Sequence, residues 1–407
     1  MKCRHCLADL QHTFLDLGYA PPSNAYLNLE DLNKPETYFP LRVKVCEKCW
    51  LTQTEDYAEA DALFSRDYAY FSSASKTWLE HAECFATEIT QELKLTVDSL
   101  VVEIASNDGY LLKNFVKKNI PCLGIEPTIS TAVAAEQLGI PVVREFFGGN
   151  LAQNLVAQGK KADLIVGNNV YAHVPDINDF TKGIQVILKA GGTICLEFPH
   201  LLNLLLLNQF DTVYHEHFSY LSLGVVQQIF AKNGLRIFDV RTLTTHGGSL
   251  RVYGCHQNDQ RVSHNRVNEM LAVEKEQGLN SLNTYLAFQK KADKVKDELL
   301  TFLLNAKCDS KKVAAYGAAA KGNTLLNYAG VKPDLLSFVC DGAKSKQGKY
   351  LPGSHIPIYA PDKLVAFAPD YVVVLPWNLI DEVQALLRPQ LGLKVKFITA
   401  VPQLQIL

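Results

Sequence analysis

The residues with the clearest chemical meaning lie in one short stretch, SLVVEIASNDGYLL, which spans Ser99 to Leu112. An apolar run ends in Glu103, a turn of small residues follows through Asn107 and Gly109, and a helix is expected to begin there. A second carboxylate, Glu126, closes the next apolar segment. A strand, a tight turn, a helix and an acidic residue about 20 positions later form the layout that holds an adenine nucleoside.

The residues of the turn indicate which nucleoside is bound. A dinucleotide needs G-x-G-x-x-G, so that the backbone and a helix N-terminus can approach the pyrophosphate. Here Ala105 and the polar residues after it occupy most of the glycine places. S-adenosylmethionine has no phosphate and tolerates a looser turn, so we expect it as the cofactor. Glu126 would bind the ribose hydroxyls, Glu103 would lie near the cationic methionine end, and Ala105, Asn107 and Gly109 would shape the turn.

Two cysteine pairs near the N-terminus indicate a metal site. Cys3 and Cys6 form one C-x2-C pair, and Cys46 and Cys49 form another. Two thiolates from each tight turn complete a tetrahedral site with four protein ligands and no open position, so we expect a structural zinc ion that takes no part in chemistry. A redox pair is the less favoured alternative, as is His5 in place of one thiolate.

The composition narrows the function classes. The chain has 407 residues, 48% of them hydrophobic and 20% charged, and a net charge of -2. These values are typical of a globular enzyme with two or three cores, and they give no sign of a nucleic-acid-binding surface. The first residues lack a signal peptide, and no apolar run is long enough for a membrane span. We therefore expect a cytoplasmic protein without a membrane or nucleic-acid partner.

Strand and helix patterns alternate after Glu126. The segments at 130–139, 150–159 and 177–190 are typical of helices, and those at 140–147, 162–170 and 193–200 are typical of strands. This alternation predicts a parallel sheet covered on both faces, with ligands at the carboxyl ends of the strands. The polar residues expected there are Asn168 and Asn169, assigned to the cofactor, and His173, Glu197 and His200. A turn role is the alternative for each.

These motifs bring out a resemblance. The Glu103 strand, the Glu126 carboxylate, ADLIVGNN and LKAGGTICLE are similar to class I S-adenosylmethionine-dependent methyltransferases. Together with the cysteine pairs, YAYFSSAS from Tyr68, YHEHFSYLS from Tyr214 and THGGSLRVYG from Thr245, the whole chain resembles the sugar C-methyltransferases, which act on nucleotide-linked 4-keto-deoxysugars.

The resemblance implies an α/β protein with an N-terminal zinc-binding module, a class I methyltransferase domain of Rossmann-like fold and a second Rossmann-like C-terminal domain that helps to hold the sugar nucleotide. We place the boundaries at residues 1–66, 67–265 and 266–407. The expected reaction is methylation at the carbon next to the ketone, with C3 favoured and C5 the alternative. The nucleotide, the stereochemistry of the sugar and the choice between a monomer and a weak homo-oligomer stay open.

Carbon methylation next to a ketone needs a base for the α-proton and hydrogen-bond donors for the enolate oxygen. His217 is our candidate base, because neutral imidazole accepts a proton at cellular pH. Glu216 or Glu197 would stabilise the imidazolium that forms. Tyr214, Tyr68 and His173 are the candidate donors, and the resemblance assigns these roles to Tyr214 and His217, with Tyr68 or Tyr70 as the tyrosine of the earlier stretch.

Two other interpretations of this cluster remain. His215 and His217 alternate, so on a strand they would share a face and could bind a catalytic metal, with Glu216 turned away. A purely structural cluster of aromatic and histidine side chains is the second alternative.

The C-terminal part begins with a polar helical stretch from about residue 265 and then returns to alternation. At Gly317 to Asn323, small side chains would let a helix N-terminus approach a diphosphate, with Lys321 supplying charge and Asn323 a further contact. Lys344, Lys346 and Lys349 would extend this pocket or lie in a solvated loop, the latter being slightly favoured.

The remaining substrate-binding candidates are Tyr70, Glu197, His200 and His246, the last in the HGGSLR motif, where a tight turn is an equal alternative. Two other functions are considered: a methyltransferase for oxygen or nitrogen acceptors, and a non-catalytic sugar-nucleotide-binding protein.

Overall fold

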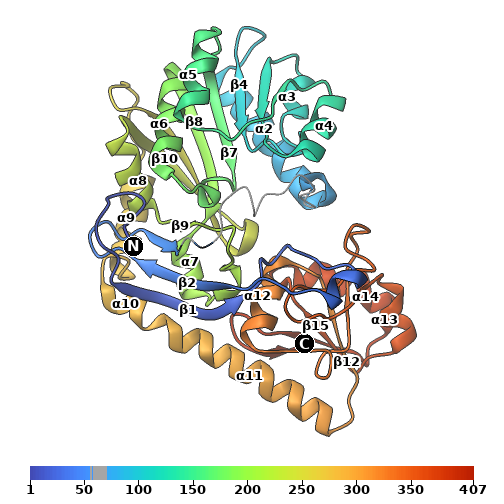
Figure 1. Ribbon diagram of the computed structural model, residues 1–407. Helices are drawn as coiled ribbons and strands as arrows, with labels where there is room; N and C mark the ends of the chain where they lie inside the picture. The colour runs from blue at the N-terminus through green and yellow to red at the C-terminus, as the bar shows by residue number, and fades with distance from the viewer. Residues whose placement is uncertain (56, 58–70) are drawn as a thin grey trace.

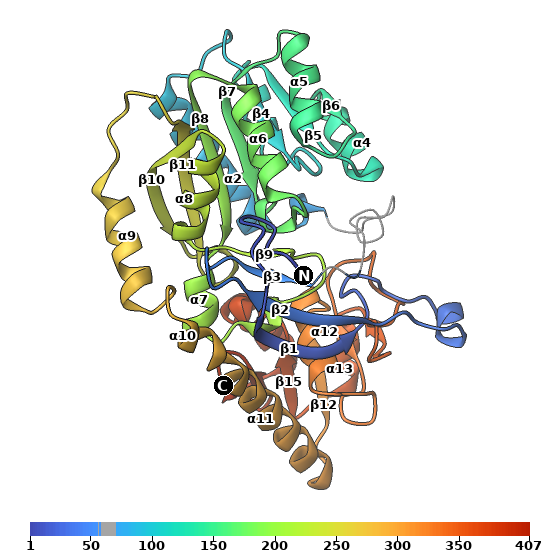
Figure 2. The same cartoon turned by 60° about the vertical axis from the view of Figure 1, so that its left-hand side comes forward.

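The computed structural model describes residues 1–55, 57 and 71–407, so that Tyr68 and Tyr70 lie outside the described residues. These residues form two α/β units with a small N-terminal sheet between them (Figures 1 and 2). This arrangement confirms the predicted fold class of a zinc-binding module, a methyltransferase domain and a second α/β domain. None of the described helices is both long and apolar enough to cross a bilayer.

The N-terminal module forms a four-stranded sheet in the order β1-β2-β3-β9. Its last strand comes from far along the chain: β9 pairs Ser219 and Tyr220 with Gln53 and Thr52. The module is therefore tied to the segment that follows the YHEH motif. The bounds are β1 His12–Ala20, η1 Leu29–Asn33, β2 Phe39–Val45, β3 Thr52–Thr54 and β9 Ser219–Tyr220.

The central unit has a seven-stranded sheet in the order β10-β11-β8-β7-β4-β5-β6. Five strands are parallel, and β11 runs antiparallel to both β8 and β10. The bounds are β4 Val101–Ile104, β5 Cys122–Ile125, β6 Val142–Val143, β7 Ala162–Asn168, β8 Leu188–Pro199, β10 Leu235–Leu243 and β11 Ser249–His256.

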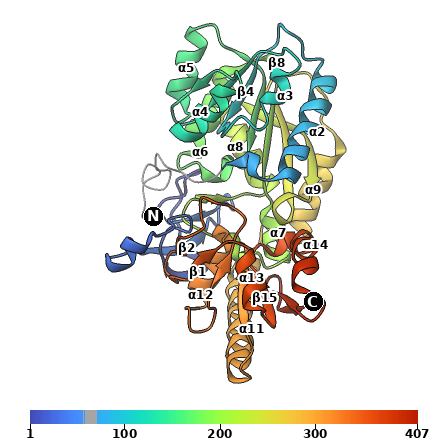
Figure 3. The same ribbon diagram turned by 90° about the vertical axis from the view of Figure 1, so that its right-hand side faces the viewer.

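Helices cover both faces of this sheet, because its strands are apolar on both sides. Val101 packs in the core beneath α2, α3 and α4, whereas its neighbour Val102 packs in the core beneath α5, α6 and α8. Figure 3 shows α2 on one side of the sheet. The bounds are η2 Ser72–Ala74, α2 Lys76–Leu93, α3 Lys113–Val116, α4 Ile129–Gln137, α5 Gly149–Ala157, η3 Tyr171–His173, α6 Ile177–Ile187, α7 Leu201–Leu206, η4 Phe210–Thr212, α8 Leu223–Lys232, η5 Thr245–Gly247 and α9 Asn265–Glu276.

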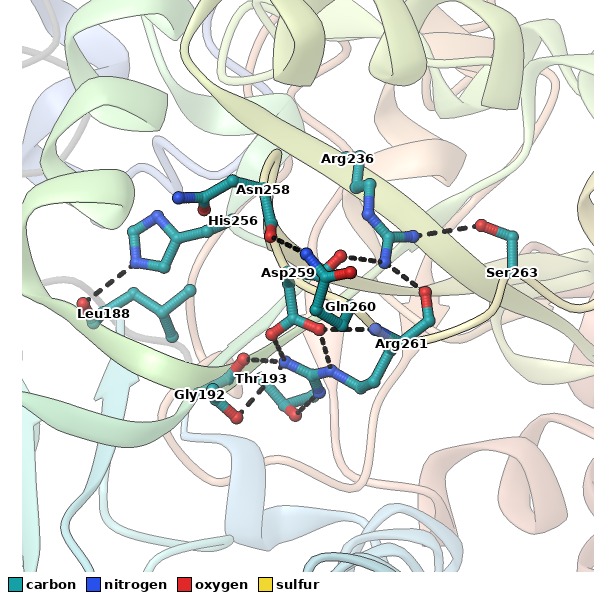
Figure 4. Close-up of polar contacts among 11 residues, drawn as sticks. Leu188, Gly192, Thr193, Arg236, His256, Asn258, Asp259, Gln260, Arg261 and Ser263 are labelled. Atoms are coloured by element: carbon teal, nitrogen blue, oxygen red, sulfur yellow. Dashed lines mark hydrogen bonds and ion pairs between the residues drawn. The ribbon is translucent and has the colours of Figure 1, made fainter.

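One departure from the sequence expectation concerns Gly191 and Gly192, which lie inside β8 and do not separate a helix from a strand. Arg261 holds this part of the strand: its guanidinium donates to the carbonyls of both glycines and to Thr193 Oγ1 at 2.6 Å (Figure 4). Asp259 pairs with the same guanidinium at 2.9 Å. This network anchors the amino-terminal end of β8, at the edge of the sheet opposite the expected site.

The C-terminal unit has a six-stranded sheet in the order β14-β13-β12-β15-β16-β17. The long helix α11 runs beside the N-terminal strands and the C-terminal unit (Figure 1), and one hydrophobic core joins it to both. The bounds are α10 Leu282–Leu286, α11 Phe288–Cys308, β12 Val313–Tyr316, α12 Ala320–Tyr328, β13 Val339–Cys340, β14 Ile358–Tyr359, α13 Asp362–Phe367, β15 Tyr371–Val374, η6 Trp377–Leu379, α14 Ile380–Leu391, β16 Lys396–Thr399 and β17 Gln405–Ile406.

Candidate active site

The turn after β4 is built from residues with left-handed backbone. Ala105, Asn107 and Gly109 have φ of 58°, 48° and 77°. A Cβ at Gly109 would come within 2.5 Å of Ile140 Cδ1 and 3.2 Å of Ala135 Cβ, so glycine lets this turn pack against α4 and the residues after it. Side chains of the turn also have fixed partners, since Asn107 Oδ1 accepts from Ser72 N–H at 2.9 Å and Asp108 Oδ2 accepts from Ser73 N–H at 3.1 Å.

Glu126 lies directly beneath this turn. Its Oε2 accepts a hydrogen bond from the Asn107 backbone N–H at 2.9 Å, and its Oε1 accepts one from Thr128 N–H at 2.9 Å. Each carboxylate oxygen keeps a second lone pair. The residue thus has the place and the acceptors that a ribose diol requires.

Glu103 is fully buried at the end of β4, and neither of its oxygens accepts a hydrogen bond of good geometry from the described residues. Burial raises the pKa of this carboxyl well above its ordinary value, although the nearby Tyr110 hydroxyl lowers it. Buried carboxylates normally have partners, so an unsatisfied one is suited to a polar or cationic ligand. The residues around the turn therefore fit S-adenosylmethionine.

Asn168 and Asn169 follow β7 at the same edge of the sheet. The Asn168 amide donates to Tyr110 Oη at 3.2 Å, and the Asn169 amide donates to His246 Nε2 at 3.1 Å. Among the described residues, neither Oδ1 atom has a partner. His246 has φ of 54° and belongs to the tight turn η5. Its ring contacts the ring of Trp78 edge to face, with 5.2 Å between centroids.

Glu197 differs from its predicted roles. It is fully buried, and its oxygens bind Thr245 Oγ1 at 2.9 Å, the Arg251 guanidinium at 3.0 Å and His81 Nε2 at 2.9 Å. Although burial opposes ionisation, these partners hold the pKa of the carboxyl below its ordinary value. Its polar atoms serve an internal network that fixes η5, whereas the sequence predicts contact with substrate or with the imidazolium.

The YHEH motif lies in a turn and not on a strand, because His217 N–H donates to the Tyr214 carbonyl at 2.9 Å. The ring of His215 faces Phe39, 5.9 Å between centroids, whereas the ring of His217 lies 3.9 Å from Tyr214 and 4.6 Å from His173. The alternative in which both histidines share one face of a strand is therefore wrong. In the described part of the chain, the only group of three or more residues suited to hold a metal is the cysteine cluster.

The contacts of His217 define its tautomer. Its Nδ1 lies 2.9 Å from the Thr212 carbonyl oxygen, which only accepts, so Nδ1 carries the proton and Nε2 of the neutral ring carries the lone pair. Burial lowers the pKa of His217 well below its ordinary value, and the charges of His173, His246 and Lys321 lower it further. The ring is therefore neutral and available as a base at cellular pH.

The neighbours of His217 come from several elements. His173 Nδ1 donates to the Glu216 carbonyl at 2.8 Å, and burial lowers the pKa of His173 to about 4. The Glu216 carboxylate, also buried, accepts from Asn24 Nδ2 at 2.8 and 3.0 Å. Asn24 belongs to the N-terminal module, so this module reaches the catalytic motif.

The sequence predicts that His200 and Asn323 bind substrate, and the structure shows a partner within the fold for one polar atom of each, whereas Asn323 Oδ1 has no partner among the described residues. His200 Nε2 binds Glu274 Oε1 at 2.7 Å, and the same carboxylate accepts from the backbone N–H groups of Leu223 and Gly224 at the start of α8. Asn323 is fully buried and its amide donates to the Ser23 carbonyl at 2.6 Å.

Lys321 extends from the first turn of α12 toward the central unit. Its Nζ donates to Asn378 Oδ1 at 2.7 Å and lies 4.7 Å from the centre of the Trp377 ring. Burial lowers the pKa of this ammonium, whereas the negative charge of Asp211 raises it. Lys346 is half-buried, and its Nζ donates to the Ala318 carbonyl at 2.8 Å, so the expected solvated loop does not describe this lysine.

The four N-terminal cysteines lie together, with all their Sγ atoms within 4.8 Å of one another. The two turns have matching geometry: Leu7 and Trp50, the residues after each pair, have φ of 63° and 65°. Four converging thiols fit a structural zinc ion. His5 is not among these ligands, and its Nδ1 binds Asn178 Oδ1 at 3.0 Å.

Several residues at this site were missed from the sequence. Trp78 and His81 are stacked, 5.0 Å between centroids, one turn apart on α2, and this i, i+3 spacing after the Ser75 cap was a local signal. Asp211 and Trp377 carry no such signal, because their contact joins two domains across 166 positions of sequence.

Comparison with known proteins gives three family matches along the chain: a zinc binding domain at residues 3–64, a methyltransferase domain at 78–240 and a C-methyltransferase C-terminal domain at 244–402. The C-methyltransferase NovU of Streptomyces niveus is 34% identical over 382 residues, which cover 94% of this chain and 91% of the relative.

Solved structures are more distant. Magnesium protoporphyrin IX methyltransferase from Synechocystis PCC 6803, with bound S-adenosylmethionine, is 14% identical and covers 43% of this chain and 78% of its own, with a TM-score of 0.33. A methyltransferase from Thermotoga maritima is 18% identical over 46% of this chain and 96% of its own, with a TM-score of 0.34. Scores this low carry no argument. The near full-length match to NovU, with the three family domains in order and a site that fits the cofactor, shows that this chain belongs to the S-adenosylmethionine-dependent C-methyltransferases with an N-terminal zinc-binding domain.

Proposed function

We propose that this chain methylates the carbon next to the ketone of a nucleoside-diphosphate-linked 4-keto-deoxysugar, with C3 favoured and C5 the alternative. The relative NovU and the C-terminal family domain support carbon as the acceptor and speak against an oxygen or nitrogen acceptor. The sugar nucleotide rests on the resemblance and on a second α/β unit whose Lys321 is near enough for its charge to lower the pKa of the candidate base.

The observation that carries the proposal is the state of His217. With its Nδ1 proton held by the Thr212 carbonyl, its Nε2 has the lone pair needed to take the α-proton. Burial favours the neutral ring, so Nε2 is unprotonated before the reaction and can accept the proton from carbon. Tyr214, in ring contact with His217, is the proposed donor to the enolate oxygen. The predicted donor role of His173 does not fit, because the single proton of its neutral ring is on Nδ1 and is donated to the Glu216 carbonyl.

S-adenosylmethionine supplies the electrophilic methyl group when it is bound at the turn after β4. Glu103 and Glu126 would hold its two ends, and Asn168 and Asn169 would line the adjoining strand end. Lys321 is proposed to bind the diphosphate, because it brings a positive charge to the start of a helix beside the base. Tyr68 and Tyr70 stay candidates for the substrate side.

The test uses the purified protein, S-adenosylmethionine and a panel of thymidine-, guanosine- and cytidine-diphosphate 4-keto-6-deoxysugars. Mass spectrometry and NMR would identify the methylated carbon. In deuterated solvent, the His217→Asn variant should lose exchange of the substrate α-proton while it keeps S-adenosylhomocysteine binding. Exchange at the wild-type rate in this variant would exclude His217 as the base, and a panel without any methylated product would count against the substrate class.

A further inference from the structure

The carbonyl group that orients the candidate base is flanked by hydrogen bonds from the C-terminal unit. Thr212 supplies this carbonyl and is the last residue of η4. The residue before it, Asp211, accepts a hydrogen bond from Trp377 Nε1 at 2.7 Å. The carbonyl of the residue after it, Val213, accepts one from Thr324 Oγ1 at 2.8 Å. Both donors lie outside the methyltransferase sheet.

These contacts are buried and closely packed. Asp211 is fully buried, and its Oδ1 has no hydrogen-bond partner among the described residues, so Trp377 is the side chain that satisfies this carboxylate. A Cβ added to Gly247 would come within 2.7 Å of Trp377 Cη2, which shows how closely the indole enters between η4 and η5. The ammonium of Lys321 lies over the other part of the indole, 4.7 Å from the ring centre.

The charges agree with this geometry. Burial raises the pKa of Asp211 to about 6, and the positive charge of Lys321 opposes this rise. An indole N–H and a nearby ammonium are the groups that let a buried carboxylate stay ionised. In the described part of the chain, both groups come from the C-terminal unit.

We propose that Asp211 is a positioning residue for His217, and that Trp377 and Thr324 hold the Asp211–Val213 segment so that the base is aligned only while the C-terminal unit is docked. The proposal rests on the proposed role of His217 as the base. It gives the C-terminal unit a part in proton abstraction in addition to binding the nucleotide. No bond is made or broken by these residues.

Two pairs of variants test the Trp377–Asp211 and Thr324–Val213 hydrogen bonds separately. Trp377→Phe removes the N–H donor and keeps an aromatic ring, whereas Asp211→Asn removes the charge and keeps an oxygen acceptor. Thr324→Val removes the hydroxyl at nearly constant volume, and Thr324→Ser restores it. Tyr285→Phe is the control, because it removes a buried hydroxyl that donates to the Leu279 carbonyl at 2.8 Å in the core beside α11.

The measurements are α-proton exchange in deuterated solvent with the panel sugar that the wild-type protein methylates, KM for that sugar, S-adenosylhomocysteine binding and thermal unfolding. We expect Trp377→Phe and Thr324→Val to slow exchange by about 10- to 100-fold, since a small misplacement of a reacting group has effects of this size. KM should stay within about threefold, Thr324→Ser should retain most of the wild-type rate, and Tyr285→Phe should exchange normally.

Wild-type exchange in both Trp377→Phe and Thr324→Val would overturn the proposal, as would a raised KM with unchanged exchange. If His217→Asn loses exchange while these variants keep it, the base assignment stands and only the positioning role falls. If His217→Asn itself keeps exchange, the proposed role of His217 as the base is refuted, and the positioning proposal is refuted with it. Should Trp377→Phe fail to fold, the comparison of Thr324→Val with Thr324→Ser decides the question.

Discussion

Replacing Glu126 by glutamine tests the cofactor site directly. The carboxylate accepts two backbone hydrogen bonds at 2.9 Å, one from Asn107 in the turn after β4 and one from Thr128 just before α4. A hydrogen bond to a charged group contributes about 1.5–3 kcal/mol. Glutamine keeps one acceptor oxygen, turns an NH2 group toward a backbone N–H and loses the charge offered to the ribose hydroxyls. We therefore expect a loss of about 1.5–3 kcal/mol in cofactor binding, which is about 10- to 100-fold in Kd.

Isothermal titration calorimetry with S-adenosylhomocysteine measures this effect, and thermal unfolding checks that the variant is folded. Glu136→Gln is the matched control: Glu136 lies on α4, is well exposed and pairs with Arg144 at 2.6 Å, so its loss should leave Kd unchanged. A Kd for Glu126→Gln within twofold of the wild-type value would refute the assignment of this carboxylate to the ribose.

Three further predictions follow from the described contacts. Cys49→Ser should lower both zinc content by mass spectrometry and the melting temperature, because a structural metal contributes to folding, and an unchanged metal content would contradict the site. Glu197→Gln should lower the free energy of unfolding in urea by about 3–5 kcal/mol, since it breaks a buried pair with Arg251, and a change below about 1 kcal/mol would contradict this. The pKa values of His173 and His246 are lowered to about 4, so below pH 6.5 the unfolded chain binds more protons and stability should fall as pH drops from about 6.5 to 4, by up to about 1.4 kcal/mol per pH unit for each histidine. Urea unfolding at several pH values measures the slope, and a flat profile would exclude it.

The sequence was sufficient where local pattern and fold coincide. Val101 and Val102 belong to a strand that is apolar throughout because helices cover both its faces, and this pattern is visible without a structure. The cysteine pairs are equally local, since each knuckle brings its two thiols together. The layout of Glu103 and Glu126 also follows from a single β-α-β unit.

The alternative in which His215 and His217 share one face of a strand fails for a physical reason. Only Ser219 and Tyr220 form a strand, and their partner is β3 in the N-terminal module. The residues before them turn back at Tyr214–His217, and the two histidine rings face different surroundings. Alternation predicts a shared face only when the backbone is extended, and tertiary contacts determine whether it is.

Polar partners that are distant in sequence could not be predicted either. The sequence suggests Glu197 for substrate because it ends a strand at the ligand-binding edge, but Arg251 lies 54 positions further along the chain and neutralises it. In the same way, the partners of Asp211 become visible only when the C-terminal unit is in place. Whether a buried carboxylate at a sheet edge binds a ligand or supports the fold thus depends on whether a cation pairs with it, and no local sequence pattern reveals that cation.

The structural zinc site and the proposed base, His217, are connected through the chain. The knuckle that ends at Cys49 leads directly into β3, whose Thr54 Oγ1 donates to the His217 carbonyl at 3.2 Å. The loop after β1 carries Asn24, which holds the carboxylate of Glu216. Loss of zinc would release both contacts while leaving the turn after β4 intact. Chelation should therefore reduce α-proton exchange at concentrations of chelator that leave S-adenosylhomocysteine binding unchanged, whereas parallel loss of both would mean that the module supports the whole fold and not the catalytic motif in particular.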